Sequence, residues 1–317
     1  MELLFLVLFS LHILKTEALV GQHWCYQSQK EEDPSCEGPR QWHETYPACS
    51  GNSQSPINIV TKNVIYDKSL KPLYFEDYDV KGSSKWIIEN NGHTGKYFKV
   101  TLSTSPKIGG GGLTRKYKAI EFHFHWGVQG VSQYLPGSEH SIDGEKEAME
   151  LHIVHIREDV ANITEAKQST DGVAVLGFFI KIDEENKNYA TIISELDNIQ
   201  FKGKTSQIDP LPLNSLLPPE DELIKYYRYE GSLTTPDCYE GVIWTVFEKP
   251  IHLSPTQVLQ FSAIHFDGKN STNMAENFRP AQFLNNRDVY WSGASILLPP
   301  AKVLMLVLIP THVLISL

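Results

Sequence analysis

The middle of the chain is a series of short segments rich in β-branched and aromatic residues, and several alternate between hydrophobic and polar positions. Successive side chains of an extended strand point to opposite faces, so this pattern predicts strands with a buried face. The residue types favour strands as well. We predict strands over Trp86–Glu89, Tyr97–Leu102, Glu121–Trp126, Glu150–His155, Val173–Ile182 and Val242–Phe247.

Turn-forming pairs and glycine runs separate these segments. They are Asn91-Gly92, Gly109–Gly112, Asp143-Gly144, Asp171-Gly172 and Asp267-Gly268. Helical periodicity is limited to Tyr189–Leu196 and Pro255–Phe261. No linker, repeat or change of composition interrupts the chain between about residues 40 and 285, which favours one domain. The sequence therefore predicts a mainly β, single-domain protein with minor helices.

The segment Glu121–Trp126 places two histidines on one face of its strand. His123 and His125 share that face with Glu121, while the aromatic residues between and after them point the other way. The segment Glu150–His155 repeats the pattern. There, Glu150, His152 and Val154 share one face, and Leu151, Ile153 and His155 share the other.

If these two strands are neighbours, His123, His125 and His152 can converge on one point. Three neutral nitrogens without a thiolate suit zinc and leave the fourth tetrahedral position open for water. A carboxylate precedes His123 and His152 by two residues on the same face, where Glu121 and Glu150 can hold the outer ring nitrogens. A single His-x-His pair is more often structural, but these carboxylates and the apolar opposite faces favour zinc.

The first 20 residues are typical of a secretory signal peptide, because their apolar run is short and small residues follow it. Secretion exposes the chain to an oxidising compartment, where Cys25, Cys36, Cys49 and Cys238 can form two disulfides. Three pairings are open from the spacing alone. In this compartment Asn162 and Asn270, each in an Asn-x-Thr sequence, are candidate glycosylation sites.

The C-terminal end predicts a lipid anchor. Ser292-Gly293-Ala294 is a triplet of small residues, and the apolar residues 296–317 end the chain. This order is typical of a glycosylphosphatidylinositol (GPI) signal, with attachment at Ser292, a linker and attachment region over 286–295, and removal of 296–317. A transmembrane helix is the alternative, opposed by three prolines and the lack of a basic stop sequence.

Charge and one hydroxyl-rich segment narrow the function further. The formal net charge is −10 and no basic patch occurs, which argues against nucleic acid as a partner. Arg228–Pro236 predicts an ordered loop, since Pro236 restricts Thr235 to extended geometry. Alone it could be an ordinary turn. Beside three histidines, its hydroxyls can accept a hydrogen bond from a metal-bound hydroxide and orient it.

Taken in order, several motifs resemble those of the α-class carbonic anhydrases, most closely the membrane-anchored isozyme IV/XV group. They span nearly the whole mature chain. They are His23–Tyr26, Gln54–Ile59, Asn90–His93, Gly137–Asp143, Gly231–Pro236 and Phe278–Ala281.

The resemblance implies an α-carbonic anhydrase fold over residues 21–285, a large, twisted, mostly antiparallel central sheet with zinc at the bottom of a conical cleft. His123, His125 and His152 resemble the zinc ligands, with Glu121, Glu150 and Asn277 behind them. Thr234 resembles the hydroxyl that accepts from zinc-hydroxide and donates to Glu139. The substrate pocket is implied to comprise Thr234, Thr235, Val154, Val175, Leu233 and Trp244. His93 resembles the proton shuttle, and Tyr26 and Asn91 resemble residues that order its waters.

The implied activity is that of a carbonate dehydratase, a zinc lyase with a role in pH regulation. Zinc-hydroxide attacks carbon dioxide to give bicarbonate and a proton, at the extracellular face of the plasma membrane. The resemblance also implies inhibition by sulfonamides and anions, the disulfides Cys25–Cys36 and Cys49–Cys238, and a bicarbonate or acid–base transporter as a candidate partner.

Two positions depart from the family pattern. Glu121 replaces a neutral amide, which predicts a higher pKa for zinc-bound water and tighter metal retention. Lys96 occupies a cleft position that is often uncharged, which affects the water chain from His93. Two other classes of function are alternatives to a carbonic anhydrase. A zinc hydrolase lacks its His-Glu-x-x-His helix here, and a catalytically weak cell-surface binding module would be expected to lose a ligand histidine.

Overall fold

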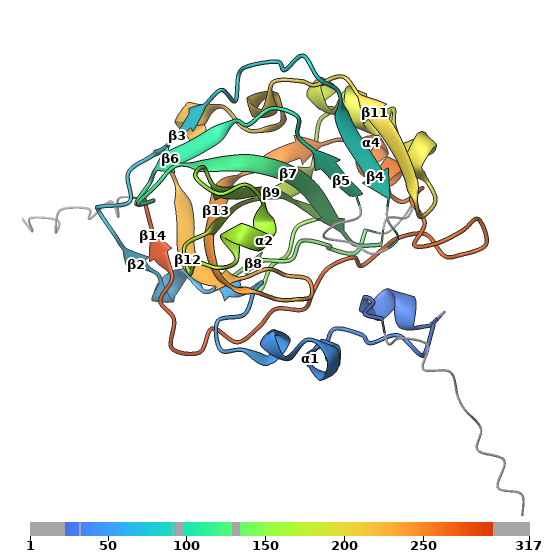
Figure 1. Ribbon diagram of the computed structural model, residues 1–317, viewed down its shortest axis with the longest axis horizontal. Helices are drawn as coiled ribbons and strands as arrows, with labels where there is room; N and C mark the ends of the chain where they lie inside the picture. The colour runs from blue at the N-terminus through green and yellow to red at the C-terminus, as the bar shows by residue number, and fades with distance from the viewer. Residues whose placement is uncertain (1–22, 32, 91, 93–97, 129–133, 294–317) are drawn as a thin grey trace, which may run out of the picture.

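The computed structural model of the chain describes residues 23–31, 33–90, 92, 98–128 and 134–293 (Figure 1). The predicted signal peptide and the apolar C-terminal segment lie outside these residues. Within the described residues, we find no helix with the length and apolar character needed to cross a membrane.

Strands dominate the described residues, and the helices are short. The strands are β1 (Asn58–Ile59), β2 (Ile65–Tyr66), β3 (Leu73–Glu76), β4 (Trp86–Asn90), β5 (Phe98–Thr101), β6 (Lys107–Gly110), β7 (Tyr117–Trp126), β8 (Ser141–Ile142), β9 (Met149–Arg157), β10 (Val173–Ile182), β11 (Lys204–Ile208), β12 (Tyr226–Ser232), β13 (Glu240–Leu253) and β14 (Tyr290–Trp291). The α-helices are α1 (Trp42–Thr45), α2 (Ile163–Ala166), α3 (Ala190–Ile193) and α4 (Pro255–Phe261). Single 3-10 turns occur at Gln27–Glu31, Pro47–Ser50, Thr61–Asn63, Lys187–Tyr189, Leu196–Ile199, Leu213–Leu216 and Glu220–Glu222.

One large twisted sheet organises the molecule (Figure 1). Within the described residues its strand order is β11-β4-β5-β7-β9-β10-β13-β12-β14-β2, and β3 joins it through β6, which pairs with β7. Most pairs are antiparallel, but β10 with β13 and β14 with β2 are parallel. A separate parallel pair, β1 with β8, lies outside this sheet. The prediction of a mainly β fold around a mostly antiparallel sheet is confirmed.

The central strands bury different side chains on their two faces. On one face, Phe122, Phe124 and Trp126 of β7 join Leu151 and Ile153 of β9 in the larger apolar core. On the other face, a smaller apolar cluster contains Val154 of β9, Val175 of β10 and Trp244 of β13. The histidines of β7 and β9 lie on this second face, as the alternation predicts.

The predicted strands agree well with the observed ones where the apolar pattern is strong. β10 has the predicted bounds, whereas β7, β9 and β13 extend beyond theirs. The prediction that Gly109–Gly112 forms only a turn was wrong, because Gly109 and Gly110 are the last two residues of β6. The prediction that all of Arg228–Pro236 forms a loop was wrong, because β12 continues to Ser232.

The helices depend on local capping more than on length. α4 has the predicted bounds and begins with a capping box, in which the Ser254 hydroxyl and the Gln257 side chain each accept from the other's backbone N–H. The predicted helix Tyr189–Leu196 is instead broken, since α3 covers only Ala190–Ile193 between two 3-10 turns. α2 packs beside β9, and the Asn162 side chain caps its N-terminus by accepting from the Glu165 backbone N–H.

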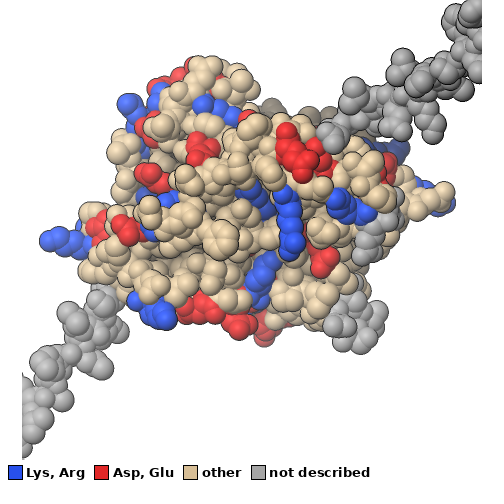
Figure 2. Space-filling view, turned by 90° about the horizontal axis from the view of Figure 1, so that it is seen from below, with Lys and Arg blue, Asp and Glu red and all other residues tan. Residues whose placement is uncertain are grey.

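On one face of the molecule, charged side chains of both signs lie close together (Figure 2). On the face in Figure 2, Lys and Arg side chains lie among Asp and Glu side chains without forming a continuous basic area. Ion pairs of this kind include Lys116–Glu76 and Lys85–Asp209, both at 2.6 Å. Exposed pairs such as these contribute at most about 1 kcal/mol each to stability.

Candidate metal centre

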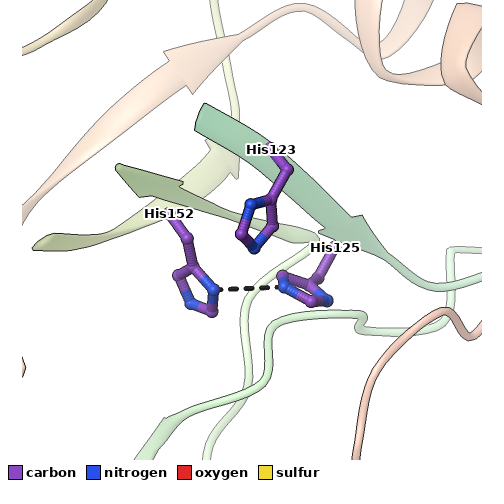
Figure 3. Close-up of side chains that lie close together, drawn as sticks. All are labelled: His123, His125 and His152. Atoms are coloured by element: carbon purple, nitrogen blue, oxygen red, sulfur yellow. Dashed lines mark hydrogen bonds between the residues drawn. The ribbon is translucent and has the colours of Figure 1, made fainter. Parts of the chain in front are cut away.

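Adjacent strands bring the three predicted histidines together. His123 of β7 lies directly opposite His152 of β9 in the antiparallel register, and His125 follows two residues later on the same face. The rings point toward one another (Figure 3), and one ring nitrogen of each lies within 4.8 Å of those of the other two. All three side chains are buried. The geometry is that of a three-nitrogen metal site.

His125 is held as a neutral ring with a defined tautomer. Its Nδ1 lies 2.8 Å from the carbonyl oxygen of Asn277. A carbonyl only accepts hydrogen bonds, so Nδ1 carries the proton and Nε2 presents a lone pair. Burial, followed by the neighbouring His152 and His123, holds the pKa of His125 well below its usual value.

His152 is oriented by a carboxylate in the same way. Its Nε2 lies 2.7 Å from Oε1 of Glu150, so Nε2 donates and Nδ1 presents a lone pair. Burial lowers the pKa of His152 to about 4, against the opposing effect of Glu150. Burial alone would raise the pKa of Glu150, but the imidazoles of His140 and His152 hold it well below its usual value.

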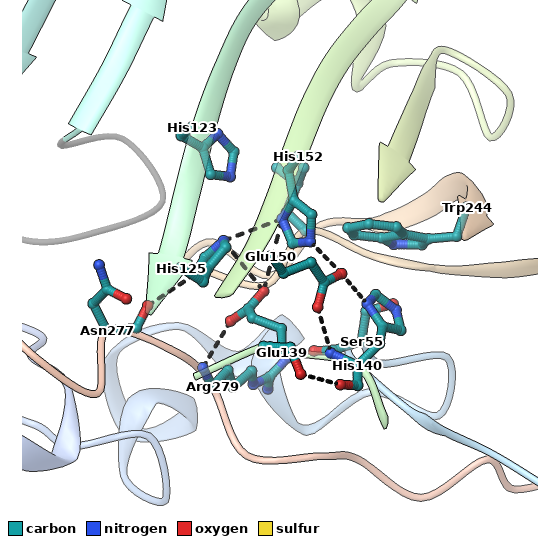
Figure 4. Close-up of polar contacts among 12 residues, drawn as sticks. Ser55, His123, His125, Glu139, His140, Glu150, His152, Trp244, Asn277 and Arg279 are labelled. Carbon is teal, nitrogen blue, oxygen red and sulfur yellow. Dashed lines mark hydrogen bonds and ion pairs between the residues drawn. The ribbon is translucent and has the colours of Figure 1, made fainter. Parts of the chain in front are cut away.

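Glu150 belongs to a wider hydrogen-bond network (Figure 4). Its carboxylate accepts from Nδ1 of His140 at 2.7 Å and from the His140 backbone N–H at 2.8 Å. Nε2 of His140 forms a hydrogen bond of 2.6 Å with the Tyr229 hydroxyl. The Tyr229 hydroxyl also forms a hydrogen bond of 2.8 Å with the Ser55 hydroxyl. This network fixes the orientation of Glu150, and through it the ring of His152.

The contact between His125 and His152 tests whether a metal fits. Nε2 of His125 lies 3.1 Å from Nδ1 of His152, and both atoms present lone pairs because the outer nitrogens hold the protons. Two acceptors at this distance repel unless a cation lies between them. Three buried imidazoles, each with one ring nitrogen close to those of the other two, are the donor set that zinc favours. The residues present therefore fit a zinc ion.

His123 is supported less closely than the other two rings. Its Nδ1 lies 3.7 Å from Oε1 of Glu121, which is longer than a hydrogen bond. Glu121 is thus the nearest carboxylate on the same face, as its position in the sequence predicts. It leaves a negative charge close to His123, where a neutral amide would leave none.

Glu139 lies against the inward nitrogens and is anchored from behind. Its Oε2 is 3.5 Å from Nε2 of His125, and its Oε1 accepts from the Arg279 backbone N–H at 2.7 Å. Burial raises the pKa of Glu139 to about 8, although the Arg279 backbone N–H that donates to it and the nearby Thr234 hydroxyl act to lower it. Thr234 and Glu139 therefore lie close together beside the three histidines.

A cavity of about 190 Å³ opens beside the histidines. All six residues predicted for the substrate pocket line it, together with His123 and His152. Its floor and walls are largely apolar, and Trp244 packs edge-on against His152 with ring centroids 4.8 Å apart. Further lining residues that the sequence pattern did not indicate are Ile120, Ile163 and Lys167.

The additional lining residues have two structural origins. The pairing of β7 with β9 shifts between Ala119 and Glu121, so Ile120 is an extra residue at a β-bulge and lies beside the cavity. Ile163 and Lys167 come from α2 and its C-terminal end. Lys167 pairs with Asp237 at 2.7 Å and so connects this segment to the loop that follows Thr235. No short-range pattern marks either origin.

Disulfides hold the loop that carries the two threonines. The structure contains Cys25–Cys36 and Cys49–Cys238, the pairing that the resemblance implies. The Cys238 backbone N–H donates to the Thr235 carbonyl at 2.7 Å. Cys49 is linked to the site as well, because the Arg279 guanidinium donates to its carbonyl at 2.9 Å.

The remaining predicted residues lie in varied surroundings. Asn91, His93 and Lys96 fall outside the described residues. Tyr26 is buried in a group of aromatic rings with Trp24 and Trp42. Asn162 and Asn270 are exposed. Ser292 follows β14, where its hydroxyl accepts from the Tyr226 backbone N–H and donates to the Ile224 carbonyl, each at 2.9 Å.

Comparison with known proteins agrees with this geometry. Residues 37–293 match the eukaryotic-type carbonic anhydrase family. Carbonic anhydrase 4 of Oryctolagus cuniculus is 41% identical over 314 residues, covering 98% of this chain and 97% of the relative. Carbonic anhydrase 15 of Mus musculus is 39% identical over 293 residues, covering 90% and 88%. Carbonic anhydrase 12 of Homo sapiens is 34% identical over 281 residues, covering 87% and 75%. With its three-histidine site intact, the chain belongs to the eukaryotic-type, or α-class, carbonic anhydrase family.

Proposed function

We propose that the protein is an extracellular zinc enzyme that catalyses the reversible hydration of carbon dioxide to bicarbonate and a proton. The observation that carries the proposal is the meeting of three buried imidazoles beside an apolar cavity. A bound zinc ion acidifies water, so that a strong nucleophile for carbon dioxide is available at neutral pH. Each remaining part of the mechanism is assigned to residues of this chain.

The apolar wall of the cavity holds the substrate. Val154, Val175, Leu233 and Trp244 offer hydrocarbon surface next to His152, and carbon dioxide is small, uncharged and poorly hydrated. Such a wall binds carbon dioxide but stabilises bicarbonate little, because the anion loses hydration there and gains no hydrogen bonds from apolar side chains. Product release is favoured by this difference.

Thr234 and Glu139 orient the nucleophile. Because Glu139 accepts from the Arg279 backbone N–H, its carboxyl group is fixed in position near Thr234. A hydroxyl that donates to Glu139 must direct its lone pairs toward the histidines, where they accept a hydrogen bond. Thr235 lies next in the chain and also lines the cavity, where it contacts the substrate.

Proton removal is assigned to His93, with Tyr26 and Asn91 ordering the waters that connect it to the metal centre. Imidazole titrates near pH 6.5 when unperturbed, so it takes up and releases protons near physiological pH. The support for this assignment is the match of the Asn90–His93 motif to the family pattern.

Glu121 is proposed to tune the pH dependence. Its carboxylate adds negative charge 3.7 Å from His123, which disfavours the loss of a proton at the metal centre. In Glu121→Gln that charge is absent, so we expect the midpoint of the pH–rate profile for carbon dioxide hydration to move to lower pH. Stopped-flow rates measured across pH test this shift. An unchanged midpoint in a variant with a full zinc complement would contradict it.

The chain organisation follows the same proposal. Residues 1–20 are a signal peptide, residues 21–285 form the catalytic domain, and residues 286–295 contain the attachment region for a GPI anchor at Ser292, with 296–317 removed. The two disulfides support a secreted protein. The exposed Asn162 and Asn270 are available for glycans. Sulfonamides and anions are expected inhibitors, and a bicarbonate transporter at the same membrane is a candidate partner.

The experiment that tests the function is stopped-flow carbon dioxide hydration by the chain expressed through a secretory route. Zinc is quantified in the same sample. We expect fast turnover with one zinc per chain. One bound zinc per chain without turnover would overturn the enzymatic proposal and favour a cell-surface binding module instead.

A further inference from the structure

A second cleft, of about 650 Å³, contains a buried arginine and lies apart from the metal centre. Turns preceding β7, β10 and β14 and the turn after β2 form its walls, and Arg228 of β12 lies within it. Along β12, Tyr227 and Tyr229 join the apolar cluster on the histidine face, whereas Tyr226 joins the core on the other face. Arg228 therefore projects from the face opposite the histidines.

The Arg228 side chain is only 8% exposed and has few polar contacts. Its Nε and Nη2 both donate to Oγ1 of Thr245, at 3.2 and 3.0 Å, across the pair β12–β13. The guanidinium also lies over the Tyr226 ring at 5.5 Å. No carboxylate among the described residues pairs with Arg228.

The unpaired end of the guanidinium faces the cleft. Nη1 of Arg228 has no hydrogen-bond partner within the described part of the chain. Nη1 lies beside Gly112, which also lines the cleft: a Cβ at that position would be 3.6 Å from Nη1 and 2.7 Å from Cδ2 of Leu70, another lining residue. The neighbouring Arg287 differs, because its guanidinium donates to four backbone carbonyl oxygens. Of the two arginines that line the cleft, Arg228 is therefore the one whose Nη1 can still donate hydrogen bonds to a ligand.

Burying a guanidinium without a counterion is costly, because the group loses hydration that no opposite charge replaces. Burial lowers the pKa of Arg228, and among the described residues it is the hydroxyls of Tyr226 and Tyr117, not a carboxylate, that act to raise it. An anion at Nη1 would offset the lost hydration and complete the donor set. Guanidinium groups bind planar carboxylates with two parallel hydrogen bonds, one of which Nη1 can supply here.

The rim of the cleft limits which anions fit. Asp67, Asp171, Glu230 and Asp288 also line it. Asp171 is partly neutralised by Arg157 at 3.2 Å, and Asp67 accepts from the Ser69 hydroxyl at 2.7 Å. The remaining negative potential repels a dianion more strongly than a monoanion. We propose that Arg228 marks a second anion-binding site, for a small monovalent oxyanion of the carboxylate type, of which bicarbonate is one.

Acetate is the probe, because the enzyme does not convert it. The full chain is labelled at its arginine side chains and titrated with sodium acetate against sodium chloride at equal ionic strength. The Arg228 guanidinium resonance is assigned from its absence in Arg228→Lys. We expect a saturable shift of that resonance with a dissociation constant on the order of 1–10 mM. Because the signal belongs to Arg228, anion binding at the metal centre does not contribute.

Two variants make the test independent of any folding defect in Arg228→Lys. Thr114 is an exposed residue at the rim, so Thr114→Glu leaves the fold intact and adds a carboxylate beside the cleft. We expect it to weaken acetate binding by about tenfold or more. Arg40→Lys, at an exposed arginine outside the cleft, is the matched control and should bind as the parent does. Absence of a saturable shift in the parent, an unchanged affinity in Thr114→Glu, or tighter binding of the phosphate dianion than of acetate would each overturn the proposal.

Discussion

Replacing His152 with alanine is expected to remove both zinc and carbon dioxide hydration, the latter by about a thousandfold or more. His125 and His123 alone leave the donor set incomplete, and Glu150 loses one of the two imidazoles that its Oε1 binds. Zinc per chain, measured by atomic emission, and stopped-flow hydration rates at fixed zinc concentration check the result.

His155 provides the matched control for the loss of a buried imidazole from the same strand. It lies on the opposite face of β9, where the Tyr78 hydroxyl contacts its Nε2 at 2.5 Å. Burial lowers the pKa of His155 to about 3, so its ring is neutral. His155→Asn should therefore lose stability but keep one zinc per chain. If His152→Ala also retained a full zinc complement, the assignment of this residue as a ligand would be wrong.

Removing the Cys49–Cys238 disulfide is expected to cost the larger part of the protein's stability and to lower turnover as well. The bridge closes a loop with a sequence separation of 189. Chain-entropy arguments give such a loop about 5 kcal/mol of the free energy of unfolding. Turnover falls because Cys238 donates to Thr235 and Cys49 accepts from Arg279, so the bridge fixes the groups that hold Thr234 and Glu139. Denaturant unfolding and hydration rates of Cys49→Ser/Cys238→Ser measure the two effects.

Cys25–Cys36 supplies the comparison for that prediction. Its sequence separation is only 11, and the same argument assigns it about 3 kcal/mol. Neither cysteine touches the groups around Glu139 in the contacts described, so Cys25→Ser/Cys36→Ser should leave turnover nearly unchanged. Equal losses of activity in the two double variants would contradict a specific role for the long loop.

The sequence was informative where local periodicity decides the structure. The alternation in Glu121–Trp126 and Glu150–His155 placed three histidines on one face, and β7 and β9 are indeed neighbours. The apolar run Val173–Ile182 specified β10 because both of its faces are buried. Short edge strands such as β2 and β14 could not be predicted, since two residues carry no period and their pairing depends on distant chain segments.

The parts of the site that escaped prediction are non-local. The resemblance names Asn277 behind the ligands, but the group of Asn277 that fixes the tautomer of His125 is its backbone carbonyl, which no side-chain pattern marks. His140 contacts Glu150 only because a turn brings them together. Lys167 reaches the cavity through its pairing with Asp237, 70 residues away. Such contacts follow from tertiary packing, which a single sequence does not display.

The alternation of faces in β7 also limits how the chain can change in length. From Glu121 onward, successive residues alternate between the face toward the cavity and the face toward the apolar core. A single insertion between Glu121 and His123 would turn the imidazoles into the apolar core and expose phenylalanines to the cavity, whereas a double insertion would restore the faces. The extra residue at Ile120 lies before this stretch, where the ladder can accommodate it. Odd changes in length are therefore confined to the part of the strand that precedes the ligands.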